Sequence, residues 1–338
     1  MPHLPLENTG PRGALNPDAS VPALTNPRFL PPPPEWGVEV AKDAVAATIR
    51  RWRDRSFPAP RFHYRGPPAG LRDGSWFDYS ILAVSVLACL WPPPDQEMWS
   101  IDYQGERLTD APALLGAITK WMGPAARPDL RSFSALDDAQ ASRLFSGGGV
   151  LQMVPERGRR LSRVAAALTE RWEGSALSLV EEAGWDGPGV VELLAATIPG
   201  YEDQARVGGH SLRFRKLAHL AAAIMASRSS RPWSGLDSFP VYPDYMLPLY
   251  LRHLGILRYS PQVSRPVDFR IEIPRHSREE VAIRWATVHA GHLLVEGLRE
   301  TGVPVTGPRL DYYLWSEAVL GPDANRMGEH HRTVTLDY

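Results

Sequence analysis

The chain has 338 residues, of which 43% are hydrophobic, 22% charged and 9% aromatic, a composition typical of a globular protein with a large core. Its 37 basic and 38 acidic residues give a net charge of -1, which argues against the broad basic face of a general nucleic-acid-binding protein. We therefore expect no stable complex with nucleic acid, although a small anionic ligand needs only a few local cations.

No segment approaches the roughly 20 consecutive apolar residues of a membrane span. The amino terminus also lacks the cationic head and apolar run of a secretory signal. Cys89 is the only cysteine, so an intramolecular disulfide is excluded and a cysteine-based metal cluster is disfavoured. We expect a cytoplasmic protein without a membrane partner.

Residues 1–36 are rich in proline, asparagine and glycine and are predicted to form an arm without packed elements. A single helical catalytic domain is expected over 37–338. Its first helix is predicted at about 37–55, where apolar residues recur every 3.6 positions. The apolar segment 77–91, which three prolines follow, is predicted to be a helix buried on most sides.

Residues 98–103 and 106–108 flank Gln104-Gly105 and predict a small β-hairpin, the clearest sheet signal in the chain. Helical patterns dominate after it, and glycines separate them. The alternating residues 332–338 predict a short extended tail. Because strands and helices do not alternate, we predict a compact, mainly α fold. The further helices are expected at about 111–122, 136–144, 159–171, 174–184, 187–197, 211–228, 243–255, 278–300 and 309–319.

Common catalytic and metal-binding signatures such as GxSxG, HExxH, CxxC and the Walker-type phosphate loop are missing. The glycine run 146–149 is followed by no lysine, so a plain loop is favoured over a phosphate loop. His289 and His292 have a spacing that suits a metal on one helix face. However, no third ligand is in register, and His292 falls in an apolar stripe. We favour histidines of the core and predict that the protein holds no metal.

Asp244 lies between aromatic residues, just before a predicted helix. Taken alone, its pattern favours the helix N-cap, one of the commonest roles of aspartate. The competing interpretation is a carboxylate that faces a cleft with aromatic walls. The two roles are compatible, because a capping carboxylate is held rigidly.

Lysine occurs only at Lys42, Lys120 and Lys216. Lys216 flanks the apolar face of its predicted helix, which suits either a solvated lysine or a compact positive charge in a site. Asp311 and Ser316 lie in another acidic and aromatic segment. Asp311 suits a helix start, and both residues suit the lining of a pocket that stacks on a flat ring. Carboxylates among aromatic residues favour binding of a heterocycle and cleavage through a cationic transition state.

The same segments resemble the queuosine salvage family, which is known for N-glycosylases of queuosine 5′-phosphate. The similarity is strongest over residues 200–320, where it covers SLRFRKLAHLAAAIM, FPVYPDYMLPLYLRHLGILRYS, REEVAIRWATVHAGHLLVEGL and LDYYLW. A thinner, collinear similarity in the first half includes Asn26-Pro27-Arg28, the loop with His63, and the hairpin SIDYQGERL.

This resemblance implies a helical fold related to that of helical DNA glycosylases, and hydrolysis of queuosine 5′-monophosphate to free queuine. It places Asp244 at the catalytic aspartate of the family. It places His63, Tyr242 and Asp311 at positions that contact the queuine base.

Lys216 matches a characteristic lysine of the family, whereas Ser316 replaces an acid that is often found there. The implied reaction needs no cofactor, and we expect a monomer whose partner is the small-molecule substrate. Three roles stay open for Asp244: a nucleophile, a residue that orients water, or an electrostatic stabiliser. The rival functions are a non-catalytic protein that binds a modified nucleoside or tRNA, and a DNA-base glycosylase.

Overall fold

The computed structural model describes residues 24–60, 70–123 and 127–338. Within these ranges the fold is mainly α, as predicted, with helices that differ widely in length. The α-helices are α1 (Lys42–Trp52), α2 (Asp73–Ser85), α3 (Asp110–Trp121), α4 (Leu130–Ser134), α5 (Asp138–Leu144), α6 (Val154–Arg171), α7 (Ala176–Glu182), α8 (Gly187–Thr197), α9 (Lys216–Ala226), α10 (Met246–His253), α11 (Pro261–Asp268), α12 (Arg278–Glu300) and α13 (Gly307–Leu320). These ranges also include three short 3-10 helices, η1 (Pro34–Trp36), η2 (Leu236–Ser238) and η3 (Ala324–Arg326).

The described residues also form three two-stranded antiparallel sheets, where the sequence predicted one hairpin. The predicted hairpin is confirmed as β2 with β3. The second hairpin, β4 with β5, turns at two glycines, and β1 pairs with the distant β6. The strands are β1 (Val38–Val40), β2 (Ser100–Tyr103), β3 (Glu106–Thr109), β4 (Gln204–Val207), β5 (His210–Arg213) and β6 (Leu257–Tyr259).

The predicted helix 77–91 is only partly correct, since α2 ends at Ser85. The chain stays buried beyond that point but is irregular, and Cys89 has a positive φ of 49°. Arg157 of α6 is fully buried there and donates hydrogen bonds to the carbonyl oxygens of Val86, Ala88 and Cys89. The buried guanidinium thus pairs carbonyl groups of an irregular segment, and two of these could not have been paired by a longer helix, because Pro92 and Pro93 have no N–H.

The helix predicted at 211–228 begins later, at Lys216, because residues 210–213 belong to β5. Arg215 lies between the two elements with a φ of 52°, which ends the strand before the helix starts. The helix predicted at 37–55 likewise starts only at Lys42, because residues 38–40 pair with β6.

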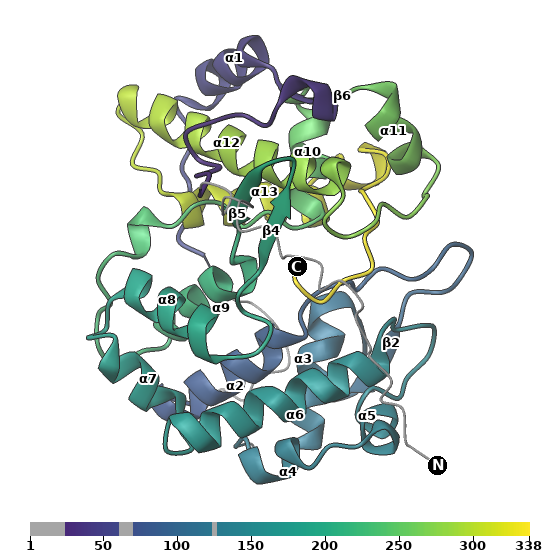
Figure 1. The fold of residues 1–338 in the computed structure, drawn as a ribbon, viewed down its shortest axis with the longest axis vertical. Helices are drawn as coiled ribbons and strands as arrows, with labels where there is room; N and C mark the ends of the chain where they lie inside the picture. Colours follow the sequence, from purple (N-terminus) through teal and green to yellow (C-terminus); the bar gives the residue numbers. More distant parts are fainter. Residues whose placement is uncertain (1–23, 61–69, 124–126) are drawn as a thin grey trace, which may run out of the picture.

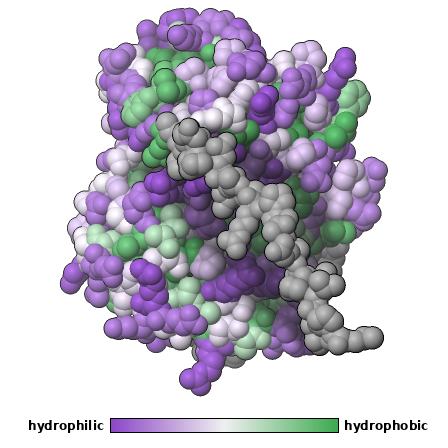
Figure 2. Space-filling view, in the orientation of Figure 1, coloured by the Kyte–Doolittle hydropathy of each residue, from purple (hydrophilic) through white to green (hydrophobic). Residues whose placement is uncertain are grey.

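The core consists of two hydrophobic clusters. The first cluster includes residues of α2–α9, and the second includes residues of α1 and α10–α13. Figure 1 shows the corresponding two groups of helices, with α2–α9 in the lower half, α1 and α10–α13 in the upper half, and the hairpin of β4 and β5 between them. The face of the molecule drawn in Figure 2 is largely hydrophilic, with hydrophobic residues in small, separate patches.

The described part of the arm, residues 24–36, lies against the upper group. Trp285 of α12 donates its indole N–H to the carbonyl oxygen of Leu30, and His289 contacts the carbonyl oxygen of Arg28 at 2.9 Å. No helix in the described ranges is both long enough and apolar enough to cross a membrane.

Candidate active site

A cavity lies where the two groups of helices meet, and aromatic side chains and carboxylates line it. The start of α3, the segment after α2 and one face of α9 contribute from the lower group. The start of α10 and one face of α13 contribute from the upper group. The lining residues are Pro60, Leu87, Leu90, Asp110, Ala111, Lys216, Leu220, Ala223, Tyr242, Asp244, Tyr245, Met246, Pro308, Asp311, Tyr312 and Trp315.

Asp244 both caps a helix and faces this cavity. Its Oδ1 accepts the backbone N–H groups of Met246 at 2.8 Å and Leu247 at 2.9 Å, at the start of α10. The other oxygen, Oδ2, has no hydrogen-bond partner among the described residues. The capping interpretation is therefore confirmed, and the cap leaves one carboxylate oxygen free to act on a ligand.

Asp311 projects from α13 across to the segment that precedes Asp244. Its Oδ1 accepts the backbone N–H of Tyr242 at 2.7 Å. This contact differs from the helix-start role considered for Asp311, because Thr306 caps α13. The hydroxyl of Tyr242 is buried and has no hydrogen-bond partner among the described residues, so a ligand in the cavity can pair with it.

Lys216 is the only cation among the described residues that line the cavity, and its side chain is buried. Burial raises the pKa of the Asp244 carboxyl, and the nearby Lys216 ammonium opposes that rise. Burial lowers the pKa of Lys216, while Asp244 and Asp311 raise it. Burial also raises the pKa of the Asp311 carboxyl well above its usual value. In all three groups the effect of burial is the largest, so the attraction between the carboxyls and the ammonium only partly offsets the shift of each pKa toward the neutral form.

Asp110 is a third carboxylate of the cavity, which sequence reasoning missed. It begins α3 with a φ of 54°, and burial raises its pKa to about 6, with Asp244 adding to the rise. Its position after a hairpin indicated only an ordinary acidic residue in a first helical turn. No local pattern indicates that the start of α3 lies beside the start of α10.

The structure brings together four of the six predicted site residues: Lys216, Tyr242, Asp244 and Asp311. Ser316 follows Trp315 on α13 but does not line the cavity. His63 lies outside the described residues, three positions after the lining residue Pro60.

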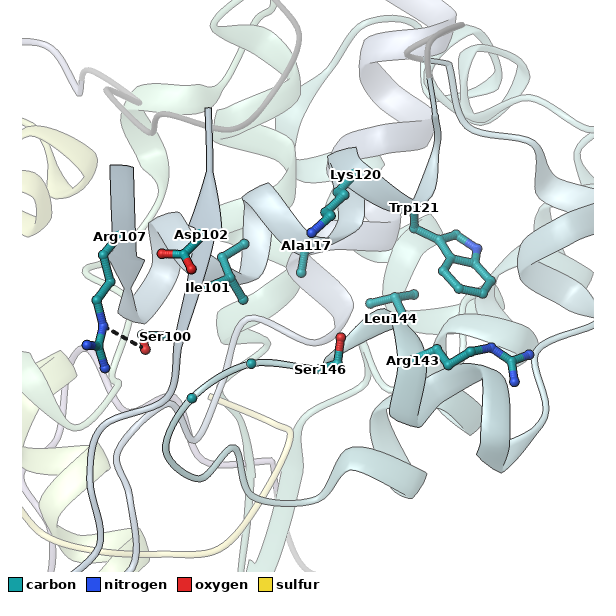
Figure 3. A pocket seen from close by; sticks show the side chains of 12 residues that line it. Ser100, Ile101, Asp102, Arg107, Ala117, Lys120, Trp121, Arg143, Leu144 and Ser146 are labelled. Carbon is teal, nitrogen blue, oxygen red and sulfur yellow. Dashed lines mark hydrogen bonds between the residues drawn. The ribbon is translucent and has the colours of Figure 1, made fainter. Parts of the chain in front are cut away.

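A second, more open groove of about 560 Å³ lies at the other end of α3 (Figure 3). It contains none of the predicted site residues. Within its wall, Gly148 exchanges two backbone hydrogen bonds with Ser100 of β2. A Cβ at Gly147 would collide with the carbonyl oxygen of Ser100. This close packing against β2 supports the plain-loop interpretation of the glycine run.

His289 and His292 do not form a metal centre with other described residues, since no group of three histidine, cysteine or acidic side chains gathers there. His289 contacts the carbonyl oxygen of Arg28, and His292 packs edge to face on Phe29 at 5.1 Å between ring centroids. Both histidines hold the arm against α12.

A family model described as queuosine salvage protein matches residues 72–338. A protein of Sphaerobacter thermophilus named queuosine 5′-phosphate N-glycosylase/hydrolase is 28% identical over 284 residues, which cover 80% of this chain and 86% of the relative. A mouse protein of the same name is 23% identical over 316 residues, covering 89% and 92%. A fission yeast protein, also of that name, is 22% identical over 264 residues, covering 73% and 76%. Because the family model spans most of the chain, this protein belongs to the queuosine salvage protein family.

Proposed function

We propose that this protein hydrolyses the N-glycosidic bond of queuosine 5′-monophosphate and releases queuine. The names of the relatives support this substrate and reaction. The observation that carries the proposal is Asp244, a carboxylate fixed by two backbone N–H groups at an aromatic-lined cavity, with its second oxygen unpaired among the described residues.

In the proposed reaction, the bond between ribose C1′ and the base nitrogen breaks, and its electron pair leaves with the base. Positive charge develops on the ribose, and the Asp244 carboxylate stabilises it. Water supplies the hydroxyl that adds to C1′, and its proton goes to the departing base. The products are queuine and ribose 5-phosphate.

Asp311 and Tyr242 are proposed to bind the base. With Oδ1 of Asp311 held by the Tyr242 backbone, the other oxygen accepts N–H groups of the 7-deazaguanine ring. His63 is proposed to contact the base as well. Lys216 is proposed to contact the phosphate. Ser316, which does not line the cavity, is proposed to bind substrate groups that extend beyond it.

We further propose that residues 37–338 form one catalytic unit, since both hydrophobic clusters contribute to the cavity. We also propose that the protein is a cytoplasmic monomer. We also propose that its architecture is related to that of helical DNA glycosylases, as the family resemblance implies, and the mainly helical body supports this proposal. The proposed chemistry requires no metal or organic cofactor, because the charge develops on the sugar and a carboxylate stabilises it.

The test is to incubate the protein with queuosine 5′-monophosphate, queuosine and queuosine-containing tRNA, and to quantify free queuine by mass spectrometry. We expect the nucleotide to be the best substrate. Loss of the 5′-phosphate removes a charge-assisted contact worth about 1.5–3 kcal/mol. No queuine from any of the three, or equally fast release from tRNA, would overturn the proposal.

A further inference from the structure

A fully buried ion pair lies beside the segment that precedes Asp244, and Glu280 adds a second buried carboxylate 3.5 Å from the same guanidinium. Arg284 of α12 and Asp203, in the loop before β4, are exposed by only 1% and 2%. Two parallel hydrogen bonds of 2.9 and 2.7 Å join the guanidinium to the carboxylate of Asp203. The guanidinium also lies 4.1 Å from the ring centroids of Phe214 and of Tyr338. Its position is therefore fixed from several sides.

Each partner of this pair also holds the backbone beside one charged residue of the cavity. Arg284 donates its Nε–H to the carbonyl oxygen of Pro243 at 3.1 Å, directly before Asp244. Asp203 accepts the backbone N–H of Lys216 at 2.9 Å through Oδ2. One ion pair thus ties together two segments that are otherwise far apart in the sequence.

Stability alone is a poor reason for this arrangement. Moving both charges out of water carries a large free-energy penalty, and well-packed apolar residues often replace buried ion pairs without loss of stability. The apolar replacement would, however, remove the hydrogen bonds to Pro243 and Lys216. We propose that Arg284 and Asp203 are positioning residues, which set the distance and orientation between Asp244 and Lys216. This inference rests on the proposed function and assigns residues that do not touch the substrate.

The first test is Arg284→Lys, which keeps the charge but loses the planar fork that makes two parallel hydrogen bonds. A displacement of about 1 Å in a catalytic group costs roughly a hundredfold in rate. We expect kcat for queuosine 5′-monophosphate to fall at least about tenfold, and KM to rise by a smaller factor because Lys216 is proposed to contact the phosphate. Asp203→Asn, which keeps the shape of the side chain, should give the same pattern.

The matched control is Arg252→Lys. Arg252 makes the same two-bond contact with Asp268, at 2.7 and 3.2 Å, and lies 4.9 Å from the ring of Tyr259, away from the cavity. Its kcat should stay within about twofold of wild type. Circular dichroism and melting curves for all variants establish that each is folded at the assay temperature.

Epistasis distinguishes positioning from a general loss of structure. If Arg284 acts through Asp244, then Arg284→Lys should not lower further the residual rate of an Asp244→Asn enzyme. An equal fall in both backgrounds, an unchanged kcat, or an effect on KM alone would overturn the inference.

A readout without turnover separates this inference from the proposed function. Lys216 and, less strongly, Arg284 lower the pKa of the Asp244 carboxyl. Because Arg284→Lys keeps the positive charge at position 284, a rise in that pKa reports mainly on the separation of Asp244 from Lys216. Carbon-13 NMR of the Asp244 carboxyl carbon measures this pKa, and the signal is assigned by its absence in Asp244→Asn. The pKa should rise in Arg284→Lys and not in Arg252→Lys.

An unchanged pKa would reject the positioning role whether or not the wild-type enzyme releases queuine. Failure of the wild-type enzyme to release queuine would reject the proposed function alone.

Discussion

At the scale of single residues, Asp244 carries two roles on two different oxygens. Oδ1 caps α10, and Oδ2 has no partner among the described residues. Capping by itself is common and says little about function. Here it matters because two backbone hydrogen bonds fix the carboxylate before substrate arrives, so no free energy is needed to orient it during the reaction.

Asp244→Asn separates these roles. Asparagine is also a good N-cap, so the melting temperature should change by no more than a few degrees. Turnover should fall by roughly 10²–10³ or more, because the charge opposite C1′ is lost. Asp186→Asn is the control, since Asp186 caps α8 through the N–H of Gly189 and does not line the cavity. If Asp244→Asn loses stability but retains its rate, Asp244 is only a cap.

Lys216→Met tests the charge balance of the cavity. The ammonium of Lys216 opposes the rise that burial imposes on the pKa of Asp244. Without it, the pKa of Asp244 should rise further, and a larger fraction of the carboxyl should be protonated at a given pH. The acidic limb of the kcat/KM profile should therefore move to higher pH. Lys120→Met, in the second groove, should leave the limb in place. An unmoved limb in Lys216→Met would mean that Asp244 titrates independently of Lys216.

At the scale of elements, helices that are followed by clear stop residues could be predicted from the sequence, as α8, α12 and α13 illustrate. Hydrophobic periodicity loses its information where a segment is buried on all sides. The end of α2 at Ser85 could not be predicted for this reason, because the buried apolar run continues to Trp91. The tail 332–338 was predicted to be extended. Arg332 forms a β-bridge with Glu272, and most of the tail is buried against the rest of the chain, which no local pattern shows.

Asp78→Asn tests how α2 is joined to α7. Asp78 accepts the backbone N–H of Ala176 at 2.6 Å, and burial raises its pKa to about 7. Between about pH 4 and pH 7 the folded protein therefore keeps a proton on Asp78 that the unfolded chain has released. The contribution of the protonated carboxyl to the free energy of unfolding is lost as the pH rises through 7. Asparagine keeps the acceptor without the charge. Asp78→Asn should match wild type near pH 4 and be more stable by about 1–3 kcal/mol at pH 8. Urea unfolding at both pH values measures the difference, and an equal gain at both would exclude titration of Asp78 as its cause.

At the scale of the whole molecule, the cavity exists only because two groups of helices meet. Residues of one segment, such as Tyr242 and Asp244, could be predicted as site residues from their local pattern and from the family resemblance. Asp110 could not, because the charged residues that act on it in the cavity, Lys216 and Asp244, are more than 100 positions away. The pairing of Asp203 with Arg284, 81 positions apart, is hidden in the sequence for the same reason.

Because both groups of helices contribute walls to the cavity, binding of the free base should stabilise the whole chain. Queuine at about 100 times its dissociation constant should add about 2.7 kcal/mol to the free energy of unfolding, provided that it binds only the folded state. The melting temperature should then rise by about 4 °C for a chain of this size. Asp244→Asn should keep this shift, since the proposed role of Asp244 concerns the ribose. Asp311→Asn should lose most of this shift. Its amide can still accept the Tyr242 N–H, but it then presents N–H donors to the N–H groups of the base.

Thermal unfolding of the three proteins with and without queuine measures these shifts. An undiminished shift in Asp311→Asn would place the base elsewhere, and a shift lost only in Asp244→Asn would exchange the roles proposed for the two carboxylates.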